Sequence, residues 1–164
     1  MRRRRGPVQR EADGTYSVEL DDTTREALLR FLTELEGLLA ASPDDTRLAR
    51  LHPGAYPLDG EKNTEWNGYM RPELDASRAA AIETARHVLS TRERLDESQV
   101  MAFMRVLNSL RLVLGTLIGV DSDEAEPSDE TLAGDDHLAA QWSLYEFCGW
   151  LLEWTVGALA GEDG

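Results

Sequence analysis

The side chains that most often perform chemistry are scattered in this sequence and form no pattern typical of a catalytic or metal site. The three histidines, His52, His87 and His137, lie on different segments, and none has a metal ligand three or four residues later. Carboxylates are abundant, but most fall on expected helix exteriors or in an acidic segment, where nothing shifts a carboxyl pKa for catalysis. No nucleophile elbow, phosphate-binding loop, dinucleotide motif or HExxH zinc motif occurs. We therefore expect no catalytic residue, no metal, no cofactor and no enzyme activity.

A line of three residues stands apart on an expected helix. Asn108, Arg111 and Gly115 follow one another at spacings of three and four, which places them together beside an apolar stripe. A glycine inside a helix costs about 1 kcal/mol relative to alanine, so we expect a second backbone to pass close to Gly115. Arg111 beside such a contact needs an acceptor, because an unpaired buried charge is costly. We expect an internal lock to a carboxylate or to helix-end carbonyls; the alternative is an anionic ligand or a partner at Asn108 and Arg111.

Cys148 is the one residue with evident redox chemistry. A single cysteine cannot form an intramolecular disulfide, which is typical of a reducing compartment. It falls near the centre of a wide apolar arc on the last expected helix, and the nearby charges, Glu146 and Glu153, are negative. Burial and negative neighbours both disfavour the thiolate, so we expect a buried thiol that oxidises slowly. The alternative is a thiol at a dimer interface that forms an intermolecular disulfide.

Most of the elements that position these residues are expected to be helical. Tyr16, Val18 and Leu20 alternate with polar residues after the turn signal Ala12-Asp13-Gly14, which predicts a β-hairpin over residues 8–20. Apolar residues recur at three- and four-residue spacings elsewhere and predict four main helices. Their expected ranges are 21–42, 72–89, 96–119 and 136–160, with a short additional helix at 44–51.

Two segments are expected to lie outside the helices. Residues 52–72 hold three of the six prolines and three glycines, which predicts a long loop. Residues 121–134 are predicted to be a flexible acidic loop, and residues 1–7 a flexible basic terminus. The fold class is therefore mainly α, a four- to five-helix bundle with a small N-terminal β-hairpin, forming one domain over residues 1–164.

Charge and hydropathy limit the partners of this domain. The net charge is −14, a field that repels nucleic acid and anionic membranes and favours basic partners. Arg2 to Arg5 form a basic start that we interpret as solvated; the alternative is contact with nucleic acid or an acidic surface. No secretory signal follows Met1, and no apolar run approaches the ~20 residues of a membrane helix. We expect a cytoplasmic protein that binds neither nucleic acid nor membrane.

The last expected helix carries more apolar surface than one core contact needs. Trp150 lies at the edge of its polar arc, one turn from Trp154. A monomer gains little by exposing both rings to water, so such a helix is either central in the bundle or shared with a partner. We expect Trp150 and Trp154 to bind a partner protein and this helix to form a homodimer.

Two segments carry a resemblance to a known family. Asn108-Ser-Leu-Arg111-Leu-Val-Leu114-Gly115-Thr-Leu117 and Trp142-Ser-Leu-Tyr145-Glu-Phe-Cys-Gly-Trp150-Leu151 resemble the two C-terminal signatures of an actinobacterial domain-of-unknown-function family. Its genes commonly lie beside the gene for the Clp protease adaptor ClpS. One branch includes an oxidative-stress regulator said to contact a sigma factor in a manner that depends on cysteine oxidation. The single Cys148 does not fit an internal-disulfide version of that mechanism.

These observations lead to three functional hypotheses. The first is a non-enzymatic regulatory or adaptor protein that contacts another protein, a transcription or proteolysis factor, as the resemblance implies. The second is a small-molecule or anion sensor with a pocket near Asn108 and Arg111. The third is a hydrolase without a recognisable motif. An exposed aromatic patch would favour the first hypothesis, and a concave polar pocket around Arg111 the second.

Overall fold

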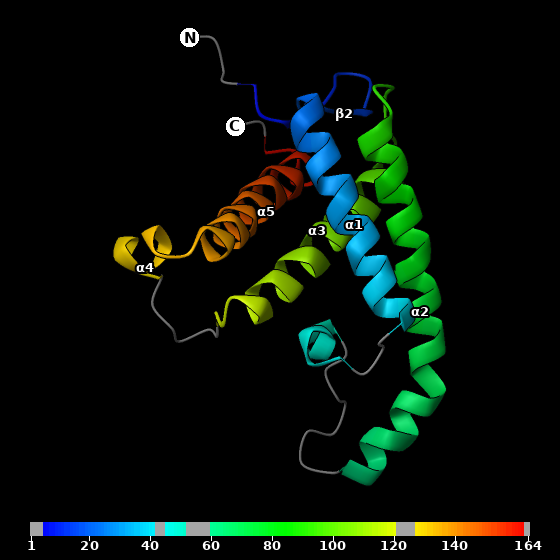
Figure 1. Cartoon of the computed structure of the whole chain (residues 1–164). Helices are drawn as coiled ribbons and strands as arrows, with labels where there is room; N and C mark the ends of the chain where they lie inside the picture. Colours follow the sequence, from blue (N-terminus) through cyan, green and yellow to red (C-terminus); the bar gives the residue numbers. More distant parts are fainter. Residues whose placement is uncertain (1–4, 42–44, 52–59, 121–126, 163–164) are drawn as a thin grey trace.

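The chain folds mainly into helices, with one small sheet at its N-terminal end (Figure 1). A computed structural model describes residues 5–41, 45–51, 60–120 and 127–162. Its elements, in chain order, are β1 (Val8–Arg10), β2 (Tyr16–Val18), α1 (Asp22–Ala41), the 3-10 helix η1 (Thr46–Leu51), α2 (Gly60–Ser90), α3 (Glu97–Leu117), α4 (Asp129–Ala133) and α5 (Asp136–Ala160). The prediction of a mainly α fold with an N-terminal hairpin is confirmed.

The hairpin forms as the turn residues predict. β1 and β2 pair antiparallel with Val8 opposite Val18, and Gly14 adopts a φ of 83°, which a side chain would disfavour. Tyr16 extends the pairing, because its N–H and carbonyl each bond to Leu95 at 2.9 Å. The hairpin is therefore held against the link between α2 and α3, which an isolated two-stranded ribbon needs for stability.

Arg25 ties three parts of the chain together from inside the core. It lies on the buried stripe of α1, one turn before Leu28, and is only 5% exposed. Its guanidinium donates to backbone carbonyls of β2, of the link before α1 and of the end of α2. The acceptors are Leu20 at 3.0 Å, Val18 at 2.6 Å, Val88 at 3.3 Å, Leu89 at 2.9 Å and Thr91 at 3.0 Å. The bonds to Val88 and Leu89 satisfy carbonyls that the end of α2 leaves without partners inside the helix.

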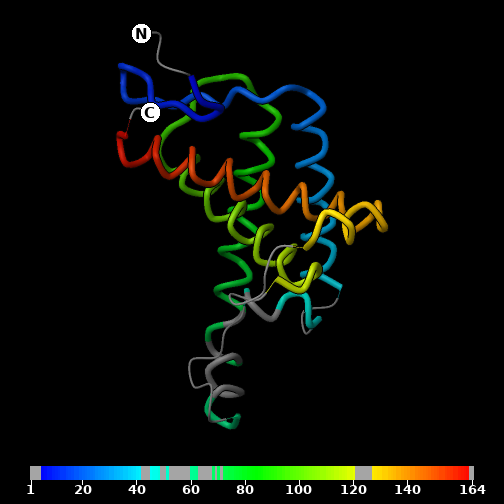
Figure 2. Tube along the Cα trace, turned by 90° about the vertical axis from the view of Figure 1, so that its left-hand side faces the viewer, coloured from blue at the N-terminus to red at the C-terminus, as the bar shows by residue number. Residues whose placement is uncertain are grey.

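α3 is the central helix and packs between α5 and α2 (Figures 1 and 2). Asp96, the first residue of the expected range, caps it in a full capping box with Gln99. Among the described residues, α3 is also the helix whose length and hydropathy would suit a membrane crossing, with a mean hydropathy of 1.4 over its most apolar window. Half of that window is buried in the structure, and core helices of water-soluble proteins pass the same test. The sequence alone predicts no apolar run of membrane length, because polar residues interrupt the apolar residues of α3. The length and mean hydropathy of α3 were therefore not expected to suit a membrane crossing.

The expected loop over residues 52–72 is wrong for its second half. α2 begins at Gly60, twelve residues before the predicted start, and Pro72 lies inside the helix. Pro72 removes one backbone donor, which would have bonded the carbonyl of Gly68. Both residues are exposed, so water can serve that carbonyl and the helix continues. Residues 52–59 lie outside the described part of the chain.

The acidic segment before α5 also contains an unexpected helix. Ser128 accepts a hydrogen bond from the Thr131 N–H at 3.2 Å and caps the short α4. The expected flexible loop over residues 121–134 is therefore wrong for residues 129–133, and residues 121–126 lie outside the described ranges. α5 has the predicted bounds, with Asp135 at its N-cap and Gly161 in the left-handed conformation after its end.

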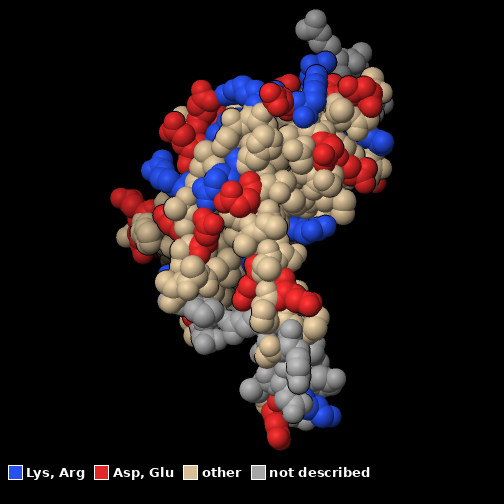
Figure 3. Space-filling view, turned by 90° about the vertical axis from the view of Figure 1, so that its right-hand side faces the viewer, with Lys and Arg blue, Asp and Glu red and all other residues tan. Residues whose placement is uncertain are grey.

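The outer face of α1 and α2 carries charges of both signs. Figure 3 shows acidic and basic side chains interspersed among uncharged ones on this side. Arg86 on α2 bonds Glu36 on α1 at 2.7 Å, and Arg92, in the link after α2, pairs with Asp22 at the start of α1. Exposed pairs of this kind add little stability individually, but they leave no large single-signed patch here.

Candidate functional site

The outer face of α5 presents an aromatic side chain to solvent. Trp150 is 46% exposed although it lies in the middle of the helix. Phe147 supports its ring at a centroid distance of 5.5 Å, and Trp154 meets it edge-on at 6.5 Å. Glu146 and Glu153, both exposed, lie on the same face. The arrangement is an aromatic ring held in place by its neighbours and bordered by negative charge.

Trp154 differs from Trp150, although the sequence suggested the same role for both. It is half-buried beneath the start of the chain, and a Cβ built on Gly6 would lie 2.1 Å from its Cε3 atom. The backbone of Gly6 therefore packs against the indole, which only glycine permits. Trp150 and Trp154 line one hollow of ≈ 440 Å³ together with Arg5, Gly6, Pro7 and Glu19. Trp154 therefore holds the N-terminal segment against α5, whereas the exposed Trp150 ring remains available for contact with another molecule.

A second hollow, of ≈ 500 Å³, opens between α5 and the second half of α3. Three aromatic residues, two carboxylates and one arginine supply most of its walls, which are Arg111, Val120, Trp142, Tyr145, Glu146, Gly149, Trp150 and Glu153. The two segments that carry the family resemblance thus meet at one place. Trp150 borders this hollow and the one beside the N-terminal segment, so it is central to the whole face.

Arg111 lies in this hollow without the partner that the sequence predicts. Its guanidinium carbon is 4.9 Å from the centre of the Tyr145 ring, a cation–π contact. Its Nε is shut off from solvent and has no hydrogen-bond acceptor. No ion pair joins Arg111 to any residue in the described ranges, so the expected lock to a carboxylate or to helix-end carbonyls has no acceptor there. The arginine that does make such a lock is Arg25.

Asn108 and Gly115 do not join Arg111 around the hollow. Asn108 is exposed and is absent from the walls of the hollow. Gly115 is buried, and its carbonyl accepts a hydrogen bond from the Val120 N–H at 2.9 Å. The glycine that makes room for Arg111 is Gly149 on α5, where a Cβ would lie 3.3 Å from the arginine Nε. Sequence spacing within one helix could not reveal this, because the contact joins two helices.

Cys148 is buried on the inner face of α5, as the helical wheel predicts. Its exposed fraction is 0%, and burial raises the pKa of its thiol to about 12, against a smaller opposing effect of the Arg111 charge. A thiol with so high a pKa is almost wholly protonated at neutral pH. No group of three His, Cys, Asp or Glu side chains suited to a metal ion occurs within the described ranges.

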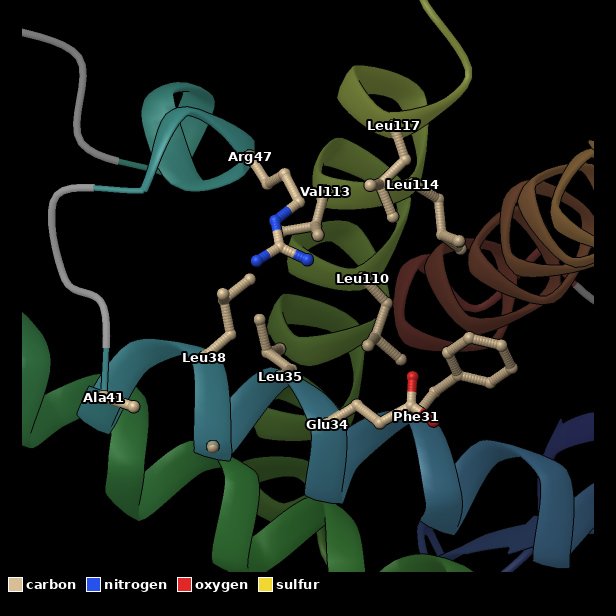
Figure 4. A pocket seen from close by; sticks show the side chains of 11 residues that line it. Phe31, Glu34, Leu35, Leu38, Ala41, Arg47, Leu110, Val113, Leu114 and Leu117 are labelled. Carbon is tan, nitrogen blue, oxygen red and sulfur yellow. The ribbon is translucent and has the colours of Figure 1, made fainter.

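An apolar pocket of ≈ 390 Å³ lies between α1, η1 and α3, on another side of the core (Figure 4). Leu38, Leu110 and Leu117 are among its walls, and the Arg47 side chain extends over it from η1. Arg47 is already engaged, because its Nε and Nη2 each donate to the Asp45 carboxylate at 2.8 Å. No local sequence pattern indicates this pocket, since its walls come from three separate segments.

Comparison with known proteins connects the chain with a family and with named relatives. The family model described as "Domain of unknown function (DUF2017)" matches residues 1–159. The "Oxidative stress regulator AosR" of Mycobacterium tuberculosis and that of Mycobacterium bovis are each 31% identical over 162 residues, covering 87% of this chain and 72% of theirs. A "Putative oxidative stress regulator AosR" of Mycobacterium leprae is 26% identical, covering 80% of this chain and 66% of that protein. No solved structure gives a significant match.

Proposed function

The chain belongs to the DUF2017 family, and from that membership we propose that it is a non-enzymatic regulator of the oxidative stress response that acts by binding another protein. The similar mycobacterial proteins carry the name of a regulator, not of an enzyme. The sequence adds no catalytic motif that would suggest a reaction. We place its action in the cytoplasm, on a factor of transcription or regulated proteolysis.

The single observation that carries the proposed contact is the exposure of Trp150. A tryptophan that is 46% exposed and supported by two other aromatic rings is the kind of residue that dominates binding energy at interfaces. Burying its ring in a partner pocket removes apolar surface from water without ordering a flexible chain, because the ring is already held.

The charge around Trp150 indicates the chemistry of the partner. Glu146 and Glu153 flank the ring on α5, and neither forms an ion pair with a residue in the described ranges. The whole chain carries a net charge of −14. We therefore propose a partner surface with an apolar pocket for Trp150 and basic side chains around it, because complementary charge accelerates and orients association.

The oxidative signal needs a source other than Cys148 in the folded chain. This thiol is fully buried, and its raised pKa disfavours the reactive thiolate. In our proposal the oxidant acts on the partner, or on the complex, and that oxidation changes the binding between the partner and the α5 face of this protein.

The test compares Trp150→Ala with Met70→Ala, a matched variant that removes another large apolar side chain, 39% exposed, from α2. Each tagged variant replaces the natural protein in its own bacterium, and captured proteins are quantified with and without peroxide. We expect Trp150→Ala to lose at least about tenfold of the specific partner and to sensitise cells to peroxide. Met70→Ala should behave as the unaltered protein.

Two results would overturn this proposal. One is a partner captured equally well by Trp150→Ala and by the unaltered protein. The other is unchanged peroxide survival after deletion of the gene, which would remove the stress-response role whatever the protein binds. Circular dichroism of both purified variants checks that each is folded before either result is interpreted.

A further inference from the structure

We infer that the hollow between α3 and α5 is a carboxylate-binding site in which Arg111 is the cation. The site takes a carboxylate that carries a positively charged group close by, as in an acidic side chain beside a basic one or in a free amino acid. This inference stands on the side chains of the hollow and does not depend on the partner proposed for Trp150.

Arg111 is a cation for which the described residues supply no anion. It is half-buried, its Nε has no acceptor, and no hydrogen bond or ion pair joins it to the described residues. A desolvated guanidinium without an acceptor is costly, and arginine forms its strongest hydrogen bonds with carboxylates. By contrast, the buried Arg25 has five carbonyl acceptors. Among the described residues, Arg25 therefore has hydrogen-bond acceptors and Arg111 has none.

The neighbours of Arg111 fix its position without neutralising it. Tyr145 lies under the guanidinium at 4.9 Å, and Gly149 lets the side chain lie close against α5. A π face attracts the cation, and among its nitrogens only Nε is shut off from solvent, so the N–H groups on the two Nη atoms remain free to donate. The hollow of ≈ 500 Å³ beside it has room for a carboxylate and the atoms that carry it. Arg111 is therefore oriented before a ligand arrives, which reduces the entropy lost on binding.

The rim of the hollow determines what accompanies the carboxylate. Glu146 and Glu153 line the same hollow, yet neither lies within ion-pair distance of Arg111. Both are exposed, whereas Arg111 is half-buried, so the hollow is positive inside and negative at its edge. A simple anion meets repulsion at the rim, whereas a carboxylate next to an ammonium or guanidinium group matches both charges.

The first experiment uses acetate, the simplest carboxylate, with chloride at equal ionic strength as the control for screening. Nuclear magnetic resonance follows the Nε–H of Arg111 and the indole N–H groups of Trp142 and Trp150. We expect saturable shifts with acetate and none with chloride. Arg111→Gln should weaken acetate binding by about tenfold or more, whereas Arg105→Gln, an exposed arginine on the same helix, should leave it unchanged.

A second variant keeps the inference testable if Arg111→Gln does not fold. Glu153→Gln removes a negative charge from the rim and should tighten acetate binding severalfold. Absence of a saturable shift up to roughly 200 mM acetate in both the unaltered protein and Glu153→Gln, where the rim repulsion is reduced, would overturn the inference. Equal acetate binding by Arg111→Gln and the unaltered protein would do so as well.

A second pair of probes identifies the source of the carboxylate. The peptide acetyl-Lys-Glu-Lys-amide is compared with acetyl-Lys-Gln-Lys-amide and with free glutamate. Tighter binding of the Glu peptide than of glutamate supports a protein side chain as the occupant, and the reverse supports a small molecule. Equal binding of the Glu and Gln peptides contradicts the carboxylate site. Loss of carboxylate binding in Arg111→Gln with unchanged partner capture would separate this site from the role of Trp150.

Discussion

At the scale of single residues, two arginines on the core helices differ in their hydrogen-bond acceptors. Arg25 falls on the apolar stripe of α1 and is satisfied by five backbone carbonyls, whereas Arg111 falls beside the stripe of α3 and meets only a ring. The spacing of Arg25 before Leu28, Leu32 and Leu35 already marks it as a residue on the buried face. That spacing is a signal for the lock at Arg25, whereas the spacing on α3 predicts it at Arg111.

We predict that Arg25→Met unfolds with a free energy lower by about 3 kcal/mol or more, because several buried carbonyls lose their donor at once. Urea denaturation followed by circular dichroism measures the difference. Arg30→Met, an exposed position on the same helix, is the control and should change stability by less than about 0.5 kcal/mol. Equal stabilities of the two variants would show that the carbonyl bonds of Arg25 contribute nothing net.

Cys148 should react with a thiol reagent only when the protein opens. Native protein at pH 8 is expected to label slowly with a small aromatic disulfide, and urea-unfolded protein rapidly and stoichiometrically, because the folded thiol has a pKa of about 12. Rapid labelling without denaturant, or a peroxide-dependent dimer on a non-reducing gel, would instead place the thiol at an accessible interface.

The same pKa shift predicts a pH dependence of stability. Because the unfolded thiol, with a pKa near 9.0, releases its proton before the folded one, the unfolded state binds fewer protons between that value and about 12. Stability should therefore fall in this range as pH rises, and fall less in Cys148→Ala. Urea denaturation of both proteins at pH 8 and pH 10 measures the difference, and parallel curves would contradict the shift.

At the scale of elements, the N-terminal segment is fastened to α5 through a single close approach. The backbone of Gly6 lies against the Trp154 indole, and β1 continues from it into the hairpin. A side chain at residue 6 cannot share that space, so the ring or the segment must move. The hairpin therefore depends on α5 as well as on the link between α2 and α3.

Gly6→Ala should destabilise the protein by about 1–3 kcal/mol through overpacking against Trp154, and should change tryptophan fluorescence. Gly37→Ala is the matched control, since no atom lies within 4 Å of a Cβ built there inside α1. This second change should raise stability by up to about 1 kcal/mol through helix propensity. Thermal melts of both variants measure the loss of stability expected for Gly6→Ala and the gain expected for Gly37→Ala. A Gly6→Ala protein as stable as the original would show that the N-terminal segment moves away from Trp154 without loss of stability.

At the scale of the whole molecule, the α5 face combines an exposed tryptophan with two carboxylates. The α1–α2 side, in contrast, has charges of both signs (Figure 3). Some of them pair with α1, as Arg86 does with Glu36 and Arg92 with Asp22. A second copy of the chain could cover the α5 face in a symmetric dimer, the commonest oligomer. Such a dimer and the proposed partner would compete for Trp150.

We predict self-association at high micromolar concentration, weakened by about tenfold or more in Trp150→Ala. Added salt should strengthen it, because screening reduces repulsion between two chains that each carry a net charge of −14. Sedimentation velocity gives the result directly. A single species of 18.3 kDa at every concentration would exclude the dimer and leave the face to other partners.

The sequence by itself determined the elements whose signals are local. The Asp-Gly turn, the capping box at Asp96 and the bounds of α5 each depend on residues within a few positions of one another, so periodicity and capping predict them. The same reasoning misjudged the start of α2, because Pro72 and the nearby glycines resemble loop signals while solvent exposure lets the helix continue through them.

Only the tertiary structure decided which residues meet. Three contacts join segments that are far apart in the chain: Gly149 with Arg111, Gly6 with Trp154, and Arg25 with the end of α2. Helical spacing fixes the direction in which a side chain leaves its own helix, but not what lies opposite it. Whether an arginine on a helix face becomes a lock or an open site therefore depends on the packing of α3 against α5 and of α1 against α2, which no local pattern encodes.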